Sequence, residues 1–471
     1  MRKGRLPVCI LLIACMLLAG CSGAIQAENK KLTVRILGND VTGFFTGALA
    51  KRIPVGEGTF TAQDGAWTYT GTFAEASGEA KVQSLEQMMS AGEVGSASQD
   101  GASPQTGTSS KASAEAKDGT LEGYFPLTVK VDGRTYYGTY SGEVRADQMA
   151  GTGKFASSEA SFAYEGEWAD GLPAGAGKVE GLAYRICIQD REIDGAYSGE
   201  LIDFVPNGIG RFRSEDNSVI YYGAWSSGVI SGQGTLCDAN YTVHFPDVDR
   251  AGSFEGDVID GVPEGTGVFT ATNDAGERYT YTGDWQNGTF EGLGTCTYEN
   301  PDVKVEDGHF SNGLYTPDMY ELARYLGSGD ADLSYQVSKR AESFLKSHAD
   351  LFPSEQAESL EAYFDRELDL KMIVKSPEKY GDEIVCVDNM QVVQIWENSL
   401  YQHESFTTML LVDKATYKDY VYVYYPSELP DAYENDTVMV YGIPLNASSY
   451  RTAAGGVNDC LILFAAYAEK R

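Results

Sequence analysis

One cysteine near the start of the chain is placed for covalent modification. Cys21 follows a basic start and an apolar run over residues 6–18. This order is typical of a secretory signal peptide. The residues directly before the thiol, Ala19 and Gly20, are small. We therefore predict that the chain is exported.

The ending of this segment resembles the bacterial lipobox, in which the cysteine is acylated and becomes the new N-terminus. The resemblance implies a lipoprotein signal peptide over 1–20 and an acyl chain such as palmitate on Cys21. It also implies a lipid anchor in the membrane, with the protein at the extracytoplasmic face of a bacterial cell. The alternatives are an ordinary signal peptide, or a short membrane anchor, with a cysteine there by chance.

Residues for catalysis are sparse. The four histidines (His244, His309, His348 and His403) lie in no zinc-protease motif and beside no plausible cysteine nucleophile. Gly-x-Gly is frequent, but it opens no helix and no nucleotide-binding lysine follows it. We predict a protein that is not an enzyme and needs no cofactor or metal.

Carboxylates leave two alternatives open. Asp257, Asp260 and Glu264 could gather near one hairpin and form the catalytic acids of a glycan-directed hydrolase. A solvated acidic face is the more common arrangement. Calcium ligands could come from the Asp-x-Asp pairs at 247–249 and 330–332, which lack an EF-hand loop.

The charge of the chain limits its partners. It has 68 acidic and 36 basic residues and a formal net charge of −32. Such a surface repels nucleic acid and anionic lipid head groups. We therefore expect no nucleic-acid partner and favour an envelope protein or a neutral glycan.

The stretch from 43 to 314 consists of repeated sequence units. An aromatic-x-Gly-x-apolar unit is followed by Gly-x-Gly, and aromatic and polar residues alternate around the glycines, as in short β-strands. Asp-Gly and Asn-Gly pairs mark tight hairpin turns. Each hairpin has too small a core to stand alone, so stability must come from stacking. The predicted repeat residues include Tyr164, Gly166, Trp168, Gly175, Gly177, Tyr197, Gly199, Gly223, Trp225, Gly256, Gly283 and Trp285.

This pattern resembles MORN repeats, whose consensus is Tyr-x-Gly-x-Trp followed by Gly-x-Gly. The resemblance implies an elongated antiparallel β-hairpin sheet that acts as a scaffold or interaction surface. Residues 21–42 would form a tether and a first strand. The acidity differs from basic, lipid-binding members, so lipid-head binding is not expected.

One segment interrupts the array. Residues 84–119 contain no aromatic side chain and are rich in Ser, Gly, Ala and Thr. Such a composition buries too little apolar surface to offset the entropy of ordering. We predict a disordered insertion at a hairpin tip; a glycosylated or partner-binding loop is the alternative.

After the array the pattern changes twice. Helical periodicity predicts a short helical linker over 315–367 that caps the array, with the first helix capped at Thr316. Strand patterns then return over 368–471, where Asp388-Asn389 reads as a turn between two strands. Five or six strands in this length suit a small barrel.

The last segment resembles OB-fold-like domains at the ends of bacterial secreted proteins and lipoproteins. Tyr420, Tyr422 and Tyr424 alternate with valines, so the tyrosines share one strand face. If the valines fill the barrel, the tyrosines form an exposed stripe for a glycan or peptide. The alternative is β-propensity alone.

The wide spacing of the remaining cysteines argues against a disulfide framework or a zinc site. Cys386–Cys460 is the one bridge considered, and buried free thiols are favoured over it. The sequence as a whole predicts a non-enzymatic, lipid-anchored surface scaffold or binding protein. The second hypothesis is a glycan-directed hydrolase or its accessory module in the envelope.

Overall fold

The computed structural model describes residues 23–76, 114–131, 133–158, 162–328, 333–364, 368–400, 404–452 and 455–471. Cys21 and residues 1–20 lie outside this part of the chain. The described residues are mainly β, as predicted, and form two compact units. The first unit runs to Tyr184 and includes 196–210 and 225–229; the second contains 185–195, 211–224 and everything from Ile230 onward.

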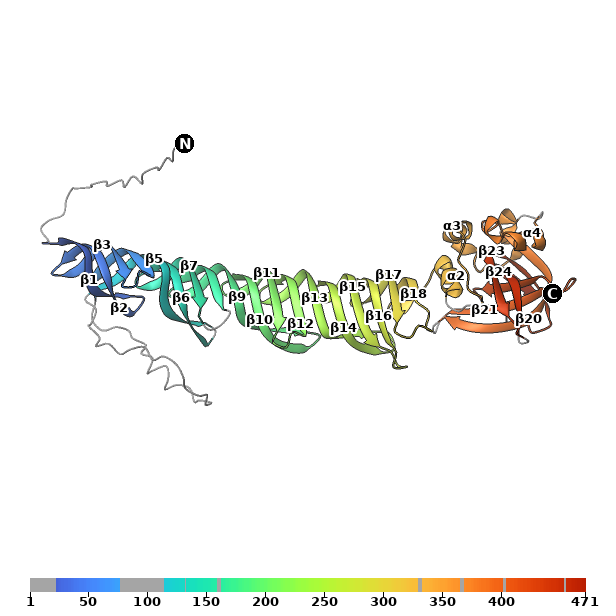
Figure 1. The fold of residues 1–471 in the computed structure, drawn as a ribbon, viewed down its shortest axis with the longest axis horizontal. Helices are drawn as coiled ribbons and strands as arrows, with labels where there is room; N and C mark the ends of the chain where they lie inside the picture. The colour runs from blue at the N-terminus through green and yellow to red at the C-terminus, as the bar shows by residue number, and fades with distance from the viewer. Residues whose placement is uncertain are drawn as a thin grey trace, which may run out of the picture. The chain divides into compact units, whose positions relative to one another are not determined.

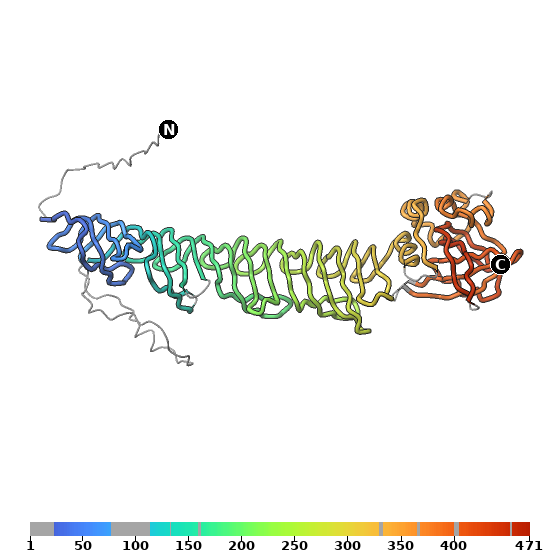
Figure 2. The backbone as a smooth tube through the Cα atoms, in the orientation of Figure 1, coloured from blue at the N-terminus to red at the C-terminus, as the bar shows by residue number. Residues whose placement is uncertain are grey.

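The repeat strands follow one another as hairpins (Figure 1). Consecutive strands pair antiparallel from β1 to β9 in the first unit and from β13 to β19 in the second. The tube in Figure 2 shows the turns of these hairpins in succession. The strands are β1 (Ile25–Ile36), β2 (Asn39–Ala50), β3 (Ile53–Ala62), β4 (Trp67–Glu75), β5 (Ala114–Val131), β6 (Arg134–Arg145), β7 (Gln148–Ser157), β8 (Ala163–Ala169), β9 (Leu172–Ile188), β10 (Arg191–Ile202), β11 (Val205–Ser214), β12 (Val219–Ser226), β13 (Val229–His244), β14 (Asp249–Ile259), β15 (Val262–Thr272), β16 (Arg278–Gln286), β17 (Thr289–Tyr298), β18 (Glu306–Ser311) and β19 (Leu314–Tyr315).

The glycines of neighbouring strands face each other beneath aromatic rings. Gly283 pairs with Gly294, and the Tyr281 ring lies over Gly294. A Cβ added to Gly294 would lie 2.4 Å from Cε2 of Tyr281. The close approach of ring to backbone therefore requires glycine at this position.

The turns adopt the conformations that their sequences predict. Asp170-Gly171 has φ values of 51° and 80°, and Asp260-Gly261 has 52° and 80°. Positive φ at both central residues defines the type I′ turn, which matches the twist of paired strands.

The predicted insertion is too long at its C-terminal end. Ala114 and Ala116 are fully buried in β5, and Gly119 pairs with Gly71 of β4. This Gly71–Gly119 pairing is the same glycine contact that recurs along the array, and it buries the small residues beside it. The lack of aromatic residues in this segment hid that contact from the sequence prediction. The prediction of disorder over 114–119 is therefore wrong, and the rest of the insertion lies outside the described residues.

The last strands of the second unit close into a barrel in the order β20-β21-β22-β24-β23. All pairs are antiparallel except β22 with β24. Val421 and Val423 point into the interior, as predicted, and are fully buried. The strands are β20 (Val385–Leu400), β21 (Glu404–Asp413), β22 (Tyr420–Tyr425), β23 (Thr437–Arg451) and β24 (Val457–Lys470).

One predicted turn is a bulge. β20 runs continuously through Asp388 and Asn389, and its pairing with β23 shifts between Val387 and Met390. Asn389 has a φ of 56°, which allows the strand to continue after an extra residue.

Short helices pack against the barrel in a second core, which contains Leu322, Phe344 and Phe464. The first helix is capped by Asp318 rather than Thr316, through a capping box with Glu321. Helical turns also occupy 370–379, within the predicted barrel segment. The helices are α2 (Met319–Gly327), α3 (Lys339–Ser347), α4 (Leu370–Lys375), η1 (Ala349–Leu351), η2 (Ala357–Tyr363) and η3 (Pro377–Lys379).

Two adjacent tyrosines of β12 test how the array is stabilised. Tyr221 is fully buried, whereas Tyr222 is 56% exposed. We expect Tyr221→Ala to lower the free energy of unfolding by about 3–5 kcal/mol, the range for removing a large buried ring. Tyr222→Ala should change it by less than about 0.5 kcal/mol. Urea unfolding of both variants measures the difference, and equal losses would contradict this account of the core.

Candidate binding surface of the repeat array

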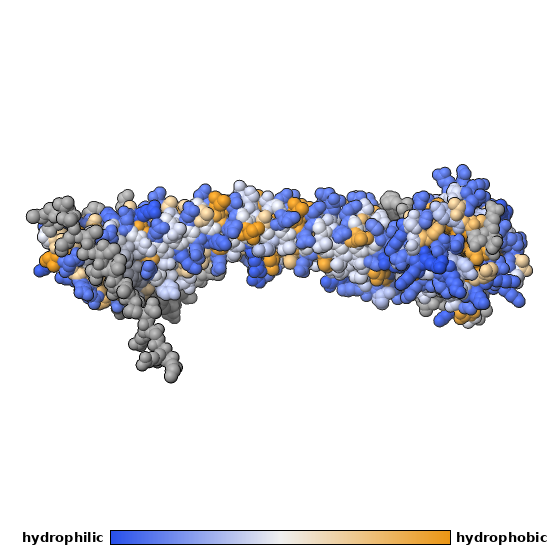
Figure 3. All heavy atoms as spheres, turned by 90° about the horizontal axis from the view of Figure 1, so that it is seen from above, coloured by the Kyte–Doolittle hydropathy of each residue, from blue (hydrophilic) through white to orange (hydrophobic). Residues whose placement is uncertain are grey.

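The two faces of the array differ in character. The predicted aromatic residues Tyr164, Trp168, Tyr197, Trp225 and Trp285 are all at most 3% exposed. They share the inner face with the glycine contacts. The opposite, outer face is more exposed and carries mainly polar side chains, with apolar exceptions such as Tyr222 and Val268. Side chains of hydrophilic residues cover most of the coloured surface in Figure 3, and hydrophobic residues occur in small groups.

The predicted glycines keep neighbouring backbones close. A Cβ on Gly166, Gly199, Gly223, Gly256 or Gly283 would lie 2.4–2.5 Å from the Cα of a glycine on the next strand. Gly177 instead lies under the Tyr164 ring. Gly175 is different, because its φ of 51° places it in a bulge beside Glu167.

Each repeat tyrosine also makes a local hydrogen bond that the sequence did not reveal. The hydroxyl donates to the carbonyl oxygen three residues later: Tyr164 to Glu167 at 2.8 Å, and Tyr281 to Asp284 at 2.7 Å. Burial raises the pKa of Tyr164 to about 12, so the hydroxyl stays protonated, and a donor, even well above neutral pH. The bond satisfies the polar end of a ring that is otherwise surrounded by backbone.

The acid after the repeat glycine has a structural role. The Asp257 carboxylate accepts the backbone N–H of Thr266 at 3.2 Å, and the Asp284 carboxylate accepts that of Leu293 at 3.0 Å. Pairing shifts register at both places, which leaves these amide groups without a partner in the ladder. In the sequence, an acid directly after the repeat glycine was the signal that could have predicted this hydrogen bond.

The other acids proposed for hydrolysis also bind hairpin backbone. Asp260 accepts the Gly232 N–H at 2.6 Å, and Glu264 accepts the Asn287 N–H at 2.9 Å. These hydrogen bonds connect one hairpin to the next. The carboxylates of Asp257, Asp260 and Glu264 therefore each have a structural role as acceptors of backbone N–H groups in the sheet.

Shallow grooves cross the outer face. One, of about 560 Å³, lies over β13–β16, with the backbone of Gly256, Gly267 and Gly283 among its lining. A second, of about 590 Å³, lies over the strands around Gly142 and Gly153 in the first unit. These grooves are the candidate binding surface, because the inner face is filled by rings.

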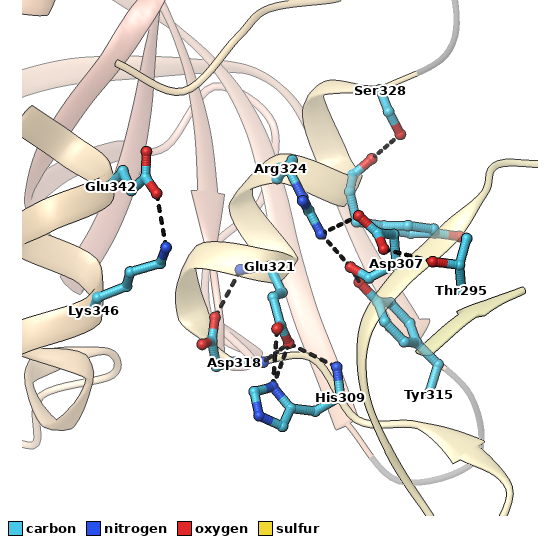
Figure 4. A network of polar contacts seen from close by, with 11 residues as sticks. Thr295, Asp307, His309, Tyr315, Asp318, Glu321, Arg324, Ser328, Glu342 and Lys346 are labelled. Carbon is cyan, nitrogen blue, oxygen red and sulfur yellow. Dashed lines mark hydrogen bonds and ion pairs between the residues drawn. The ribbon is translucent and has the colours of Figure 1, made fainter. Parts of the chain in front are cut away.

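The end of the array is capped by α2 (Figure 4). The Glu321 carboxylate accepts the backbone N–H of His309, on β18, and that of Asp318, both at 3.0 Å. Arg324 forms an ion pair with Asp307 at 2.7 Å. β18 thus receives from a helix the carboxylate that an acid of the repeat supplies elsewhere, which agrees with the predicted capping role of the linker.

Among the residues that the structure describes, His309, Asp318 and Glu321 form a group that could hold a metal ion. Their donor atoms lie within 4.8 Å of one another. However, Asp318 accepts the Glu321 N–H at 2.7 Å, and His309 Nδ1 lies 2.9 Å from the Glu321 carboxylate. The same groups are used by the helix cap, so the arrangement is explained without a metal. Of the predicted calcium pairs, Asp249 contacts His244 at 2.7 Å, and 330–332 lies outside the described residues.

The predicted ligand face on β22 is covered. Tyr424 is 6% exposed, and its ring centroid lies 6.0 Å from that of Tyr335, which precedes α3. Tyr420 and Tyr422 are partly buried in the same cluster. The prediction of an exposed tyrosine stripe is therefore wrong, because the helices and their connecting segment pack on this face of the barrel.

The five cysteines in the described residues are free thiols, including Cys386 and Cys460. Cys296 and Cys460 are buried, as favoured, and burial raises the pKa of each to about 12. Cys187 is exposed and Cys237 is partly exposed, so the expectation of buried thiols does not hold for these two cysteines.

Comparison with known families agrees with this geometry. The MORN repeat model matches five stretches, at residues 140–158, 164–180, 221–243, 254–275 and 281–300. These five stretches are MORN repeats. The copy that begins at Tyr197 is not matched, although its hydroxyl donates to Glu200 as in the matched repeats. None of the curated proteins compared matches the chain.

The repeats suggest a binding or scaffold role. They also agree with the predicted fold class, since MORN repeats and a small five-stranded barrel are both present. Within the described part of the chain, no helix has both the length and the apolar character needed to cross a bilayer.

A buried carboxyl group on β18 gives a pH-dependent prediction. Glu306 is 5% exposed, and burial raises its pKa to about 7 from 4.5. The folded protein therefore binds more protons than the unfolded chain between these values, and stability should fall as pH rises from about 4.5 to about 7. Glu306→Gln should remove this slope in unfolding experiments across that range. The exposed Glu299→Gln should retain it, and an unchanged slope in Glu306→Gln would contradict the assignment.

Proposed function

We propose that this protein is a non-enzymatic, lipid-anchored scaffold or binding protein at the extracytoplasmic face of a bacterial membrane. The observation that supports the binding role is the difference between the two faces of the repeats. Aromatic rings fill the inner face, whereas the outer face keeps open grooves. The lipobox-like sequence around Cys21 supports the anchor and the location.

The barrel would be an OB-like module. The closed order β20-β21-β22-β24-β23, with its single parallel pair, supports this proposal. Because the tyrosine face is packed under helices, the barrel would serve chiefly to hold the end of the array. An envelope protein would be the partner that the repeats bind.

The lipid anchor is tested by Cys21→Ser. Loss of the thiol should prevent acylation, so the protein should move from the detergent phase to the aqueous phase in a Triton X-114 separation. Cys187→Ser is the matched control, because this thiol is exposed and lies within the sheet. Unchanged detergent partitioning of Cys21→Ser would refute the anchor.

The proposal that the protein is not an enzyme is tested separately. Purified protein incubated with cell-wall polysaccharide should release no new reducing ends. Turnover that disappears in Asp257→Asn would establish the hydrolase alternative, since asparagine retains the hydrogen-bond acceptor for Thr266 but removes the charge.

A further inference from the structure

The groove over β13–β16 has two parallel walls of side chains. Residues opposite one another on adjacent strands form the first wall, in the order Cys237, Glu255, Val268 and Thr282. Thr266 and Asp284, which are also paired, belong to the second. Paired glycines lie between the walls. An extended segment laid across the strands would contact both walls at regular intervals.

The walls combine apolar and acidic groups. Val268 is 37% exposed on this face. Glu255, Asp257 and Asp284 are also exposed, and they give the groove negative charge. No basic residue lines the groove among those described. A ligand must therefore offer both positive charge and apolar contact.

The groove of the first unit provides an internal comparison. There the residue after the second glycine is Lys154, which forms an ion pair with Glu165 at 3.0 Å. In the second unit Val268 follows Gly267 at the corresponding position. The two grooves share a glycine floor, but only the first has a lysine among its lining residues.

We propose that the groove over β13–β16 binds an extended, basic segment of a partner protein. This inference rests on the proposed binding function and names the chemistry of the partner. Lysine or arginine side chains would meet Glu255 and Asp284, while apolar side chains between them would contact Val268. A second copy of the chain fits poorly, because each copy carries a net charge of −32.

A cysteine thiol in the groove allows peptide binding to be measured at the site itself. Cys237 lies in the first wall and is partly exposed, whereas Cys187 is exposed on β9, outside the groove. The probe is a short synthetic peptide in which lysine alternates with leucine. In the detergent-solubilised full-length protein, the peptide should slow alkylation of Cys237 by iodoacetamide and leave Cys187 unchanged. Mass spectrometry of each cysteine measures the two rates.

Two valines of β15 give matched variants. Val268→Lys introduces into the groove the lysine that the first unit has, and should weaken peptide affinity by about tenfold through like-charge repulsion. Val262→Lys makes the same change at a residue that is 44% exposed and outside the groove, and should leave the affinity within about twofold. Unfolding measurements establish that both variants are folded.

Three results would overturn the inference. The first is equal weakening by both lysine variants, which would indicate attraction to the acidic surface in general. The second is equal protection of Cys187, and the third is equal binding of a peptide with glutamate in place of lysine. Absence of binding would reject the basic partner alone, because Cys21→Ser tests the anchored scaffold independently.

Discussion

The array depends on the packing of a tyrosine ring against a bare glycine on the next strand. The ring buries a large apolar surface where a single-layer sheet would otherwise have little core, and its hydroxyl finds a carbonyl three residues along. Glycine weakens a strand by itself, so the contact must supply the stability that the sequence lacks locally. Because the rings of the repeat motif are buried on one side, the other side is left mainly to polar residues and shallow grooves.

The same constraint determines how the array must end. A repeat is stabilised by its neighbours, so the end of the array needs a substitute for the repeat that does not follow. Helix α2 supplies one through Glu321, whose carboxylate binds β18 and its own helix start together. Since α2 also packs into the core that covers the barrel, the cap connects the array to the barrel within one compact unit.

Local patterns in the sequence predicted the features that depend on local chemistry. The repeat register, the Asp-Gly turns and the inward valines of β22 follow from glycine conformations and strand alternation. Predictions failed where a distant segment decides the outcome. Tyr424 is buried by Tyr335, a contact that no local pattern encodes. Asn389 reads as a turn residue, but pairing with β23 makes it a bulge. Asp257 looked like a free acid because its backbone partner arises from a register shift.

A double-mutant cycle between Tyr281 and Gly294 tests the central claim most directly. The three atoms nearest to a Cβ on Gly294 all belong to Tyr281, so the two positions should be strongly coupled. We predict that Gly294→Ala destabilises the protein when Tyr281 is present and costs much less in a Tyr281→Ala background. The coupling energy should be about 1 kcal/mol or more, measured by urea unfolding. Additive losses would show that the ring and the glycine stabilise the array independently, and would contradict this account.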